Sequence, residues 1–356
     1  MEINRGMSET IKIKDRIIGP GKPAYIIAEM SANHAGSFER AIEIIHEAKK
    51  AGADCIKIQT YTADTITLDC HNEYFTLKGG TWNGENLHDL YEKAYTPWEW
   101  QQELKEEAER IGIDFFSTPF DPTSVDFLES IGSEFYKIAS FEVVDIPLIK
   151  KVAKTGKPII MSIGMATPDE IEDAVNAVYS TGNKQLALLK CCSVYPAIAD
   201  NMNLRTMEDM RKRFGVAVGL SDHSMGHVAA LTAVAMGANI IEKHFCLGRD
   251  IENPDSSFSM EPDEFKKMVD DIRMAEKAMG KVSYELSEME MNSRNTRKSI
   301  FVSTDIKKGE VISSENIRVV RPAYGLEPKY YEEVIGMKAN RNLEFGTPLS
   351  FEVLDR

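Results

Sequence analysis

The sequence has 356 residues, of which 43% are hydrophobic and 28% are charged. This length exceeds the usual size of a single domain, and the composition is typical of a globular enzyme. The net charge is −14, because 56 acidic residues outnumber 42 basic residues. An acidic chain of this kind is a poor ligand for nucleic acid and for anionic membranes. An anionic substrate therefore needs a local cluster of basic side chains.

The five cysteines form no Cys-x-x-Cys pair, and the neighbours Cys191 and Cys192 are poorly placed for a disulfide. We therefore expect reduced thiols and a cytoplasmic protein. The sequence contains no run of about 18 apolar residues, which argues against a membrane span. The first ten residues are polar and lack the apolar segment of a signal peptide, and we expect the first few to be frayed.

A short alternating segment at 11–18, followed by GPGKP, predicts a β-hairpin packed against the end of the next domain. From Tyr25 onwards, short apolar strands alternate with amphipathic helices. The predicted strands cover residues 25–28, 55–58, 114–117, 135–138, 158–162, 186–190, 216–220 and 239–243. The predicted helices cover residues 38–50, 98–111, 124–131, 146–155, 168–179, 204–214, 228–236 and 261–279. Thr96, Asp121 and Thr167 each precede a proline at an expected helix start and predict N-caps.

Eight strand–helix units predict a (β/α)8 TIM barrel, which occupies residues 1–280 together with the hairpin. A doubly wound open sheet is the alternative, although no Gly-rich dinucleotide-binding turn follows the first strand. Residues 281–297 are polar and predict a linker with some helix. Residues 298–356 predict a small, mostly β domain with one helical patch at 328–334.

The segment at 61–95 is longer than the strand–helix rhythm needs, and it contains many aromatic and polar residues. A long loop on a compact enzyme is often a lid or a binding loop. A surface excursion without a role is an equally good interpretation of the sequence.

The stretch GLSDHSMGHVAALTAVAMGANIIEKHF places one histidine at the end of each of two consecutive strands. These are His223 and His244. Parallel neighbouring strands end side by side, so we expect the two imidazoles to face each other across a small gap. Two such imidazoles suit a divalent metal ion. The alternative is that each histidine only forms a hydrogen bond at its strand end.

Further polar residues follow the strands, at the end of the barrel where active sites lie. They are Glu29, Lys57, Gln59, Ser117, Thr118, Lys137, Ser140, Glu142, Lys190, Ser193, Tyr195, Ser221, Glu242 and Lys243. Lys57 and Lys137, with several hydroxyl groups around one metal, suit a small substrate that carries phosphate and carboxylate. Either lysine could instead pair with a neighbouring glutamate, and Glu29 could serve only as such a partner.

Several motifs resemble the sialic acid synthase family, and the match extends from about Tyr25 to the end of the chain. They are IIAEMSANHAGS, GADCIKIQTYTADTITL, FFSTPFD, YKIASFE, GLSDHSMG and IEKHF. The C-terminal VVRPAYGLEPKYYEEVIGMKA resembles the antifreeze-like (SAF) domain of that family. The segments KGGTWNGENLHDLYEKAYTPWEW, LLKCCSVYPA and IENPDSSFS are more similar to the branch that makes pseudaminic acid than to the N-acetylneuraminate branch.

This resemblance implies an enzyme that condenses phosphoenolpyruvate with the open-chain aldehyde of an amino sugar, giving a nine-carbon 2-keto acid and phosphate. For the pseudaminic branch the sugar is 2,4-diacetamido-2,4,6-trideoxy-L-altrose. The residues implied to hold phosphoenolpyruvate are Lys57, Thr118, Lys137, Ser140 and Ser221. Ser193 stands where sialic acid synthases usually have Asn, which affects how the substrate carboxylate is held. Tyr195 and Asp255 are implied to line the sugar pocket.

The resemblance also implies that His223 and His244 bind Mn²⁺, or Mg²⁺ or Co²⁺ in its place, to polarise the aldehyde or activate water. The residues that it places in catalysis are Glu29, Gln59, Lys137, Glu142 and His223. Arg321 of the SAF domain is implied to cover the active site of a partner subunit. The resemblance therefore implies a homodimer in which that domain excludes water from the site.

Three other hypotheses stay open at this point. The nearest is the same chemistry on N-acetylmannosamine or on the precursor of legionaminic acid. A Schiff-base aldolase with Lys190 as its amine belongs to a different enzyme class. The third is a non-enzymatic binding role of the C-terminal domain, and the small size of that domain argues against it.

Overall fold

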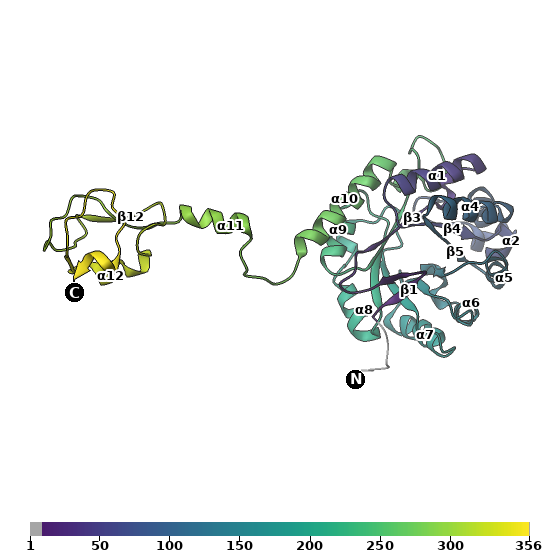
Figure 1. Cartoon of the computed structure of the whole chain (residues 1–356). Coiled ribbons are helices and arrows are strands. Elements are labelled where there is room, and N and C mark those ends of the chain that lie inside the picture. Colours follow the sequence, from purple (N-terminus) through teal and green to yellow (C-terminus); the bar gives the residue numbers. More distant parts are fainter. Residues whose placement is uncertain (1–8, 356) are drawn as a thin grey trace. The chain divides into compact units, whose positions relative to one another are not determined.

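The computed structural model describes residues 9–355. The frayed start that the sequence predicts concerns residues outside this part. The chain divides into two compact units, one that ends at Gly280 and one that begins at Lys281 (Figure 1). The boundary between a linker and the second domain at 297–298 stays a prediction.

Eight parallel strands close into a barrel in the first unit, which confirms the predicted TIM barrel and excludes the open sheet. The strands are β3 Tyr25–Glu29, β4 Cys55–Thr60, β5 Asp114–Pro119, β6 Tyr136–Ile138, β7 Ile159–Ser162, β8 Leu186–Cys191, β9 Ala217–Asp222 and β10 Ile240–His244. Their order around the barrel follows the chain, and β10 pairs with β3 to close it. All eight C-terminal strand ends therefore meet at one rim.

A layer of helices covers the outside of the barrel (Figure 1). The main helices are α1 Phe38–Lys50, α4 Trp98–Ile111, α5 Pro122–Ser130, α6 Ile146–Ala153, α7 Pro168–Tyr179, α8 Thr206–Phe214, α9 Val228–Ala235 and α10 Pro262–Met279. Asp121 and Thr167 cap α5 and α7 with their side chains, as predicted. The predicted cap at Thr96 is wrong, because α4 begins at Trp98 and the Thr96 hydroxyl lies 3.3 Å from Nε2 of His34.

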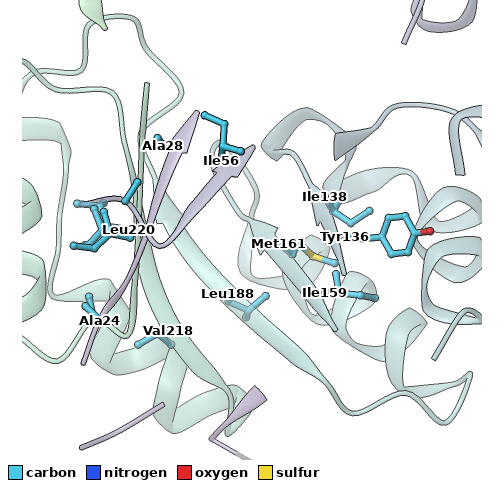
Figure 2. Close-up of a cluster of buried hydrophobic side chains, with 14 of the residues drawn as sticks. Ala24, Ala28, Ile56, Tyr136, Ile138, Ile159, Met161, Leu188, Val218 and Leu220 are labelled. Carbon is cyan, nitrogen blue, oxygen red and sulfur yellow. The ribbon is translucent and has the colours of Figure 1, made fainter. Parts of the chain in front are cut away.

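Alternate residues of each strand face opposite sides of the barrel wall. The outward residues, such as Ile56, Leu188 and Leu220, pack with the helices into the main hydrophobic core (Figure 2). The inward residues at the strand starts, such as Tyr25 and Phe116, form a separate cluster inside the barrel. Beyond this cluster the inward positions become polar, which confines the chemistry to the C-terminal rim.

The N-terminal hairpin closes the other end of the barrel. It consists of β1 Ile11–Ile13 and β2 Arg16–Ile18, which pair antiparallel. Ile11, Ile13 and Ile18 are buried in the same cluster as the inward residues at the strand starts. The predicted hairpin is therefore confirmed, and it forms the floor of the barrel.

The long segment at 61–95 contains local structure of its own. It includes α2 Ala63–Ile66 and α3 Leu87–Ala94, with turns between them. Among the described residues, no helix has both the length and the apolar character needed to cross a bilayer.

The second unit is built from short antiparallel pairs around a core of its own. β11 Ser299–Val302 pairs with β12 Ile317–Val320, and β13 Lys338–Ala339 pairs with β14 Leu354–Asp355. The predicted helical patch forms the short helix α12 Tyr331–Val334 and the single turn before it. A further short helix, α11 Glu288–Ser293, precedes β11.

Candidate active site

The barrel rim encloses a small cavity, here called the inner cavity, of about 50 Å³. Ten of the predicted site residues line it: Glu29, Lys57, Gln59, Thr118, Lys137, Ser140, Tyr195, Ser221, His223 and His244. Strand register explains their convergence, since Glu29 pairs with Lys57 on one side and with His244 on the other. The rim therefore gathers side chains that are separated by more than 200 residues in the chain.

Two lysines and two glutamates form a buried charge network in the inner cavity. Oε1 of Glu242 lies 3.6 Å from Nζ of Lys57 and 3.4 Å from Nζ of Lys137. Glu29 forms a second ion pair with Lys57, whose Nζ also donates to Oγ1 of Thr118 at 3.2 Å. Burial raises the pKa of Glu29 against the opposing attraction of Lys57. Burial, assisted by the charge of Lys57, lowers the pKa of Lys137 despite the attraction of Glu242.

Glu242, which the sequence places at the rim without a role, is the main residue of the cavity that was not assigned to catalysis or binding. The attraction of Lys137 and Lys57 overcomes its burial and holds the pKa of Glu242 below its usual value. The strand alternation contained the signal, because Glu242 lies two residues before His244 and therefore on the same inward face. Ser162 and Cys191, which also line the cavity, follow from the same rule on β7 and β8.

Two serine hydroxyl groups stand close to Gly164: Ser140 lines the inner cavity, whereas Ser193 does not. The backbone N–H of Gly164 donates to Oγ of Ser140 at 3.0 Å. A Cβ at Gly164 would lie 2.1 Å from Oγ of Ser193 and 2.8 Å from Oγ of Ser140, so only glycine fits there. Ser193 also lies 3.5 Å from the Cys191 thiol. These short hydroxyl side chains and the lysines together suit the oxygen atoms of a small anion.

His223 and His244 face each other, as the sequence predicts, with ring centroids 5.4 Å apart. Nδ1 of His223 donates to the carbonyl of Cys192 at 3.0 Å, which leaves Nε2 as the nitrogen that can bind a metal once the ring is neutral. Against the effect of its burial, contacts with Cys191 raise the pKa of His223, so a metal bound there would displace a proton. Burial, and then the charge of His223, lowers the pKa of His244 well below its usual value, which keeps that ring neutral. Nδ1 of His244 is buried without a hydrogen-bond partner. Two imidazoles in this state are suitable donors for a divalent metal ion.

Within residues 9–355, no group of three or more His, Cys, Asp or Glu side chains is arranged to hold a metal ion. The two histidines therefore fit a metal only if substrate or water completes its coordination, which is the arrangement of catalytic rather than structural sites. Asp255, which we expect in the sugar pocket, does not line the inner cavity, and its Oδ2 lies 4.0 Å from Nδ1 of His244. That carboxylate also accepts a hydrogen bond from the N–H of Ala32.

Several expected residues lie outside the inner cavity. Lys243 points away from it and donates to Asp222 at 2.8 Å. Lys190 also points away, donating to the carbonyl of Cys191 at 3.0 Å, so the predicted Schiff-base amine is not at the site. Arg321 belongs to the second unit, directly after β12, where it is exposed.

Glu142 follows β6 and is not part of the cavity wall, although its neighbours Ser140 and Phe141 are. Its Oε2 is buried without a hydrogen-bond partner, and burial raises the pKa of Glu142 to about 7. A carboxyl group with a raised pKa in the folded state binds its proton more tightly there than in the unfolded state. Its contribution to stability is therefore complete below about pH 4 and is lost as the pH rises through 7.

We expect Glu142→Gln to remove this pH dependence. At pH 5 the variant and the parent protein should unfold at similar temperatures. At pH 8 the variant should be more stable by about 2 kcal/mol, because one unit of pKa corresponds to about 1.4 kcal/mol and the group is not fully shielded from water. Thermal unfolding across pH 5–8 measures the difference, with Glu332→Gln on the exposed side of α12 as control. A constant difference across this range would contradict the assignment.

Comparison with known proteins places these features in a family. Residues 44–284 match the NeuB family, and residues 297–354 match the SAF domain. The pseudaminic acid synthase of Campylobacter jejuni is 48% identical to the chain, over 92% of this chain and 96% of that protein. The N,N'-diacetyllegionaminic acid synthase of the same species is 39% identical, over 90% of this chain and 97% of that protein.

A solved structure agrees with the fold as well. The N-acetylneuraminic acid synthetase of Leptospira borgpetersenii is 34% identical and superposes with a TM-score of 0.71, over 81% of this chain and 95% of that one. The resemblance inferred from the motifs is confirmed for both units. The chain therefore belongs to the NeuB family.

Proposed function

We propose that this protein is a pseudaminic acid synthase, which condenses phosphoenolpyruvate with 2,4-diacetamido-2,4,6-trideoxy-L-altrose. The observation that carries the proposal is the convergence of Lys57, Lys137, His223 and His244 at one cavity in a NeuB-family barrel. The choice of sugar rests on identity. Within one species the chain is 48% identical to the pseudaminic acid synthase and 39% identical to the legionaminic acid synthase.

Phosphoenolpyruvate is assigned to the floor of the inner cavity. Lys57 and Lys137 supply two buried positive charges, and Thr118, Ser140 and Ser221 supply hydroxyl donors. Charge-assisted hydrogen bonds in a site that excludes water are much stronger than in solution. Because the protein as a whole carries a net charge of −14, an anion is attracted to these buried lysines rather than to the surface in general.

The condensation joins C3 of phosphoenolpyruvate to the aldehyde carbon of the sugar, and the aldehyde oxygen takes up a proton. Water then adds at C2 and loses a proton, after which the C2–O bond breaks and phosphate leaves. Glu29 is suited to hold the proton for the aldehyde oxygen. Once the substrate phosphate neutralises Lys57, Glu29 loses its partner, and burial then favours its protonated form. Gln59 orients Glu29 through a hydrogen bond of 3.0 Å from Nε2 to Oε1.

Mn²⁺ or a similar ion is assigned to His223 and His244. When bound, such an ion supplies a Lewis acid that polarises a carbonyl oxygen or lowers the pKa of water. Nδ1 of His223 donates to the carbonyl of Cys192, and the carboxylate of Asp255 lies 4.0 Å from Nδ1 of His244. Partners behind a ligating histidine fix the orientation of its ring.

A homodimer is part of the proposal. Exposed apolar side chains surround the barrel rim, one after each of four consecutive strands. They are Phe141, Met165, Val194 and Met225, and each is at least 51% exposed in the single chain. Exposed apolar side chains gathered at one part of the rim suit a surface that another chain covers. Arg321, exposed after β12, is the proposed contribution of the partner subunit to the covered site.

Mixing two inactive variants tests the shared site. We expect Arg321→Ala and Lys137→Met each to be nearly inactive alone. Random exchange of subunits makes half of the dimers mixed, and each mixed dimer has one intact site, so activity should return to about a quarter of the parent level. A mixture as inactive as its components would show that each site is built from one chain. Two Lys137→Met preparations mixed together serve as the control.

Phosphate release tests the function directly. The protein is incubated with phosphoenolpyruvate, Mn²⁺ and one of three sugars: the trideoxy-L-altrose derivative, N-acetylmannosamine or the legionaminic acid precursor. We expect the highest kcat/KM with the first. Preference for another sugar would keep the chemistry and change the substrate. No release with any amino sugar would refute the proposal.

The Schiff-base aldolase loses its structural basis, because Lys190 does not line the cavity. Borohydride trapping of a pyruvate adduct, with activity that survives EDTA, is the result that would restore it. The proposal also places the enzyme in the cytoplasm. All five cysteines are free, which suits a reducing compartment.

A further inference from the structure

A second cavity of about 460 Å³ lies beside the rim, and we call it the outer cavity. Its wall comes from the long segment at 61–95 and from the segment that follows β10. The residues that matter here are Trp82, Asn83, Leu90, Lys93, Asn253 and Pro254. The long segment, which had no assigned role, therefore contributes to a concave surface.

The two cavities differ in size in a way that assigns them different ligands. The inner cavity of about 50 Å³ has room for a few waters or a small anion, but not for a hexose with two acetamido groups. Ligand pockets of proteins typically measure about 300–1,000 Å³, and the outer cavity falls in this range. The sugar therefore needs the outer cavity while its aldehyde reaches the inner one.

Trp82 forms the wall between the cavities. Its ring centroid lies 5.5 Å from that of Tyr195, and the Tyr195 ring lies 4.2 Å from that of His223. Trp82, which lines the outer cavity, and Tyr195, which lines the inner one, thus stand between the outer cavity and His223.

Hydrogen bonds fix the orientation of this wall. Nε1 of Trp82 donates to the carbonyl of Pro254 at 3.2 Å, which joins the long segment to the segment after β10. The hydroxyl of Thr81 donates to the carbonyl of Tyr195. With its only polar atom engaged, Trp82 presents an apolar face to the cavity, as do Leu90 and Pro254.

The lining therefore combines apolar with polar residues. Lys93 and Glu85 form an ion pair of 3.4 Å, and Asn83 and Asn253 add amide groups. Amide and charged groups suit the two acetamido groups of the sugar. A methyl group gains by burial against the apolar residues, whereas a hydroxyl group placed there loses hydrogen bonds to water without a replacement.

We propose that Trp82, with Leu90 and Pro254, receives the C6 methyl group of the acceptor sugar and selects a 6-deoxy sugar over its 6-hydroxy counterpart. This inference rests on the proposed function and adds the structural element that sets its specificity. The long segment at 61–95 is then a specificity loop rather than a surface excursion.

The test compares two sugars that differ in one oxygen atom: 2,4-diacetamido-2,4,6-trideoxy-L-altrose and its 6-hydroxy analogue. For the parent protein we expect kcat/KM to favour the deoxy sugar by about 10–100-fold, the range that apolar pockets achieve. Trp82→Ala should reduce this ratio about tenfold, mainly through a higher KM for the deoxy sugar. KM for phosphoenolpyruvate should stay within about twofold, because Trp82 does not line the inner cavity.

Tyr74→Ala is the matched control, because Tyr74 is an aromatic residue of the same segment that is 82% exposed and lines neither cavity. It should leave the ratio unchanged. Trp82→Phe keeps an aromatic wall and should retain most of the selectivity. Should Trp82→Ala fail to fold, Leu90→Thr provides the second measurement, since a hydroxyl on the wall should favour the 6-hydroxy sugar.

The outcomes separate the two levels of the argument. Phosphate release from neither sugar by the parent protein removes the proposed function and the inference with it. Activity in the parent protein, combined with a ratio that Trp82→Ala and Leu90→Thr leave unchanged, overturns the inference alone. An equal fall in kcat/KM for the two sugars would also overturn the inference, because it indicates that the loop supports folding without contacting C6.

Discussion

Replacing Lys137 by Met is expected to lower kcat/KM for phosphoenolpyruvate about 10³-fold, with little change in the fold. Lys137 is buried and lines the inner cavity beside Glu242. The substitution keeps the length of the side chain and removes one ammonium group that faces the substrate anion. Charge-assisted contacts in a site without water are worth about 3–4 kcal/mol, which corresponds to this factor.

Lys190→Met is the control for Lys137→Met. Lys190 lies near the C-terminal end of β8, and its ammonium group donates to the carbonyl of Cys191 outside the cavity. We expect its kcat/KM to stay within about threefold of the parent value. Steady-state phosphate release and thermal unfolding of both variants measure the two effects. Equal losses in the two variants would mean that the cavity does not hold the anion.

The second large effect is expected at the histidine pair. His244→Ala should abolish tight Mn²⁺ binding, measured by calorimetry, and lower turnover about 10³-fold, since a Lewis acid supplies several kcal/mol. His227→Ala is the control, because His227 lies four residues after His223 but pairs with Asp271 at 3.0 Å on the outside of the barrel. Only the first variant should lose its metal. Parent-level activity in EDTA would remove the metal from the proposal altogether.

The rhythm of short apolar strands and amphipathic helices carried most of the predictive power of the sequence. It located all eight strands within about two residues, because each is apolar and is bounded by turn residues. It also brought Lys57, Lys137 and the two histidines to one rim, since parallel strands in a barrel end together. The family motifs then pointed to the chemistry.

The sequence does not show directly whether a side chain near a strand end faces the cavity or the outside of the barrel. Lys57 and Lys243 both stand near strand ends, yet one faces the cavity and the other pairs with Asp222 behind the wall. Counting alternation from His244 separates them and also identifies Glu242. No such rule applies to Asp255, because it follows a loop whose path depends on contacts with distant residues such as Ala32.

The isoleucine floor made by the hairpin has a kinetic consequence. Because the hairpin closes the barrel behind the charged cluster, we expect both substrates to enter and both products to leave at the C-terminal rim. We therefore expect phosphoenolpyruvate to bind before the bulkier sugar, and phosphate to leave after the nine-carbon acid. A compulsory order of arrival and departure is thus set by three apolar side chains that never touch either reactant.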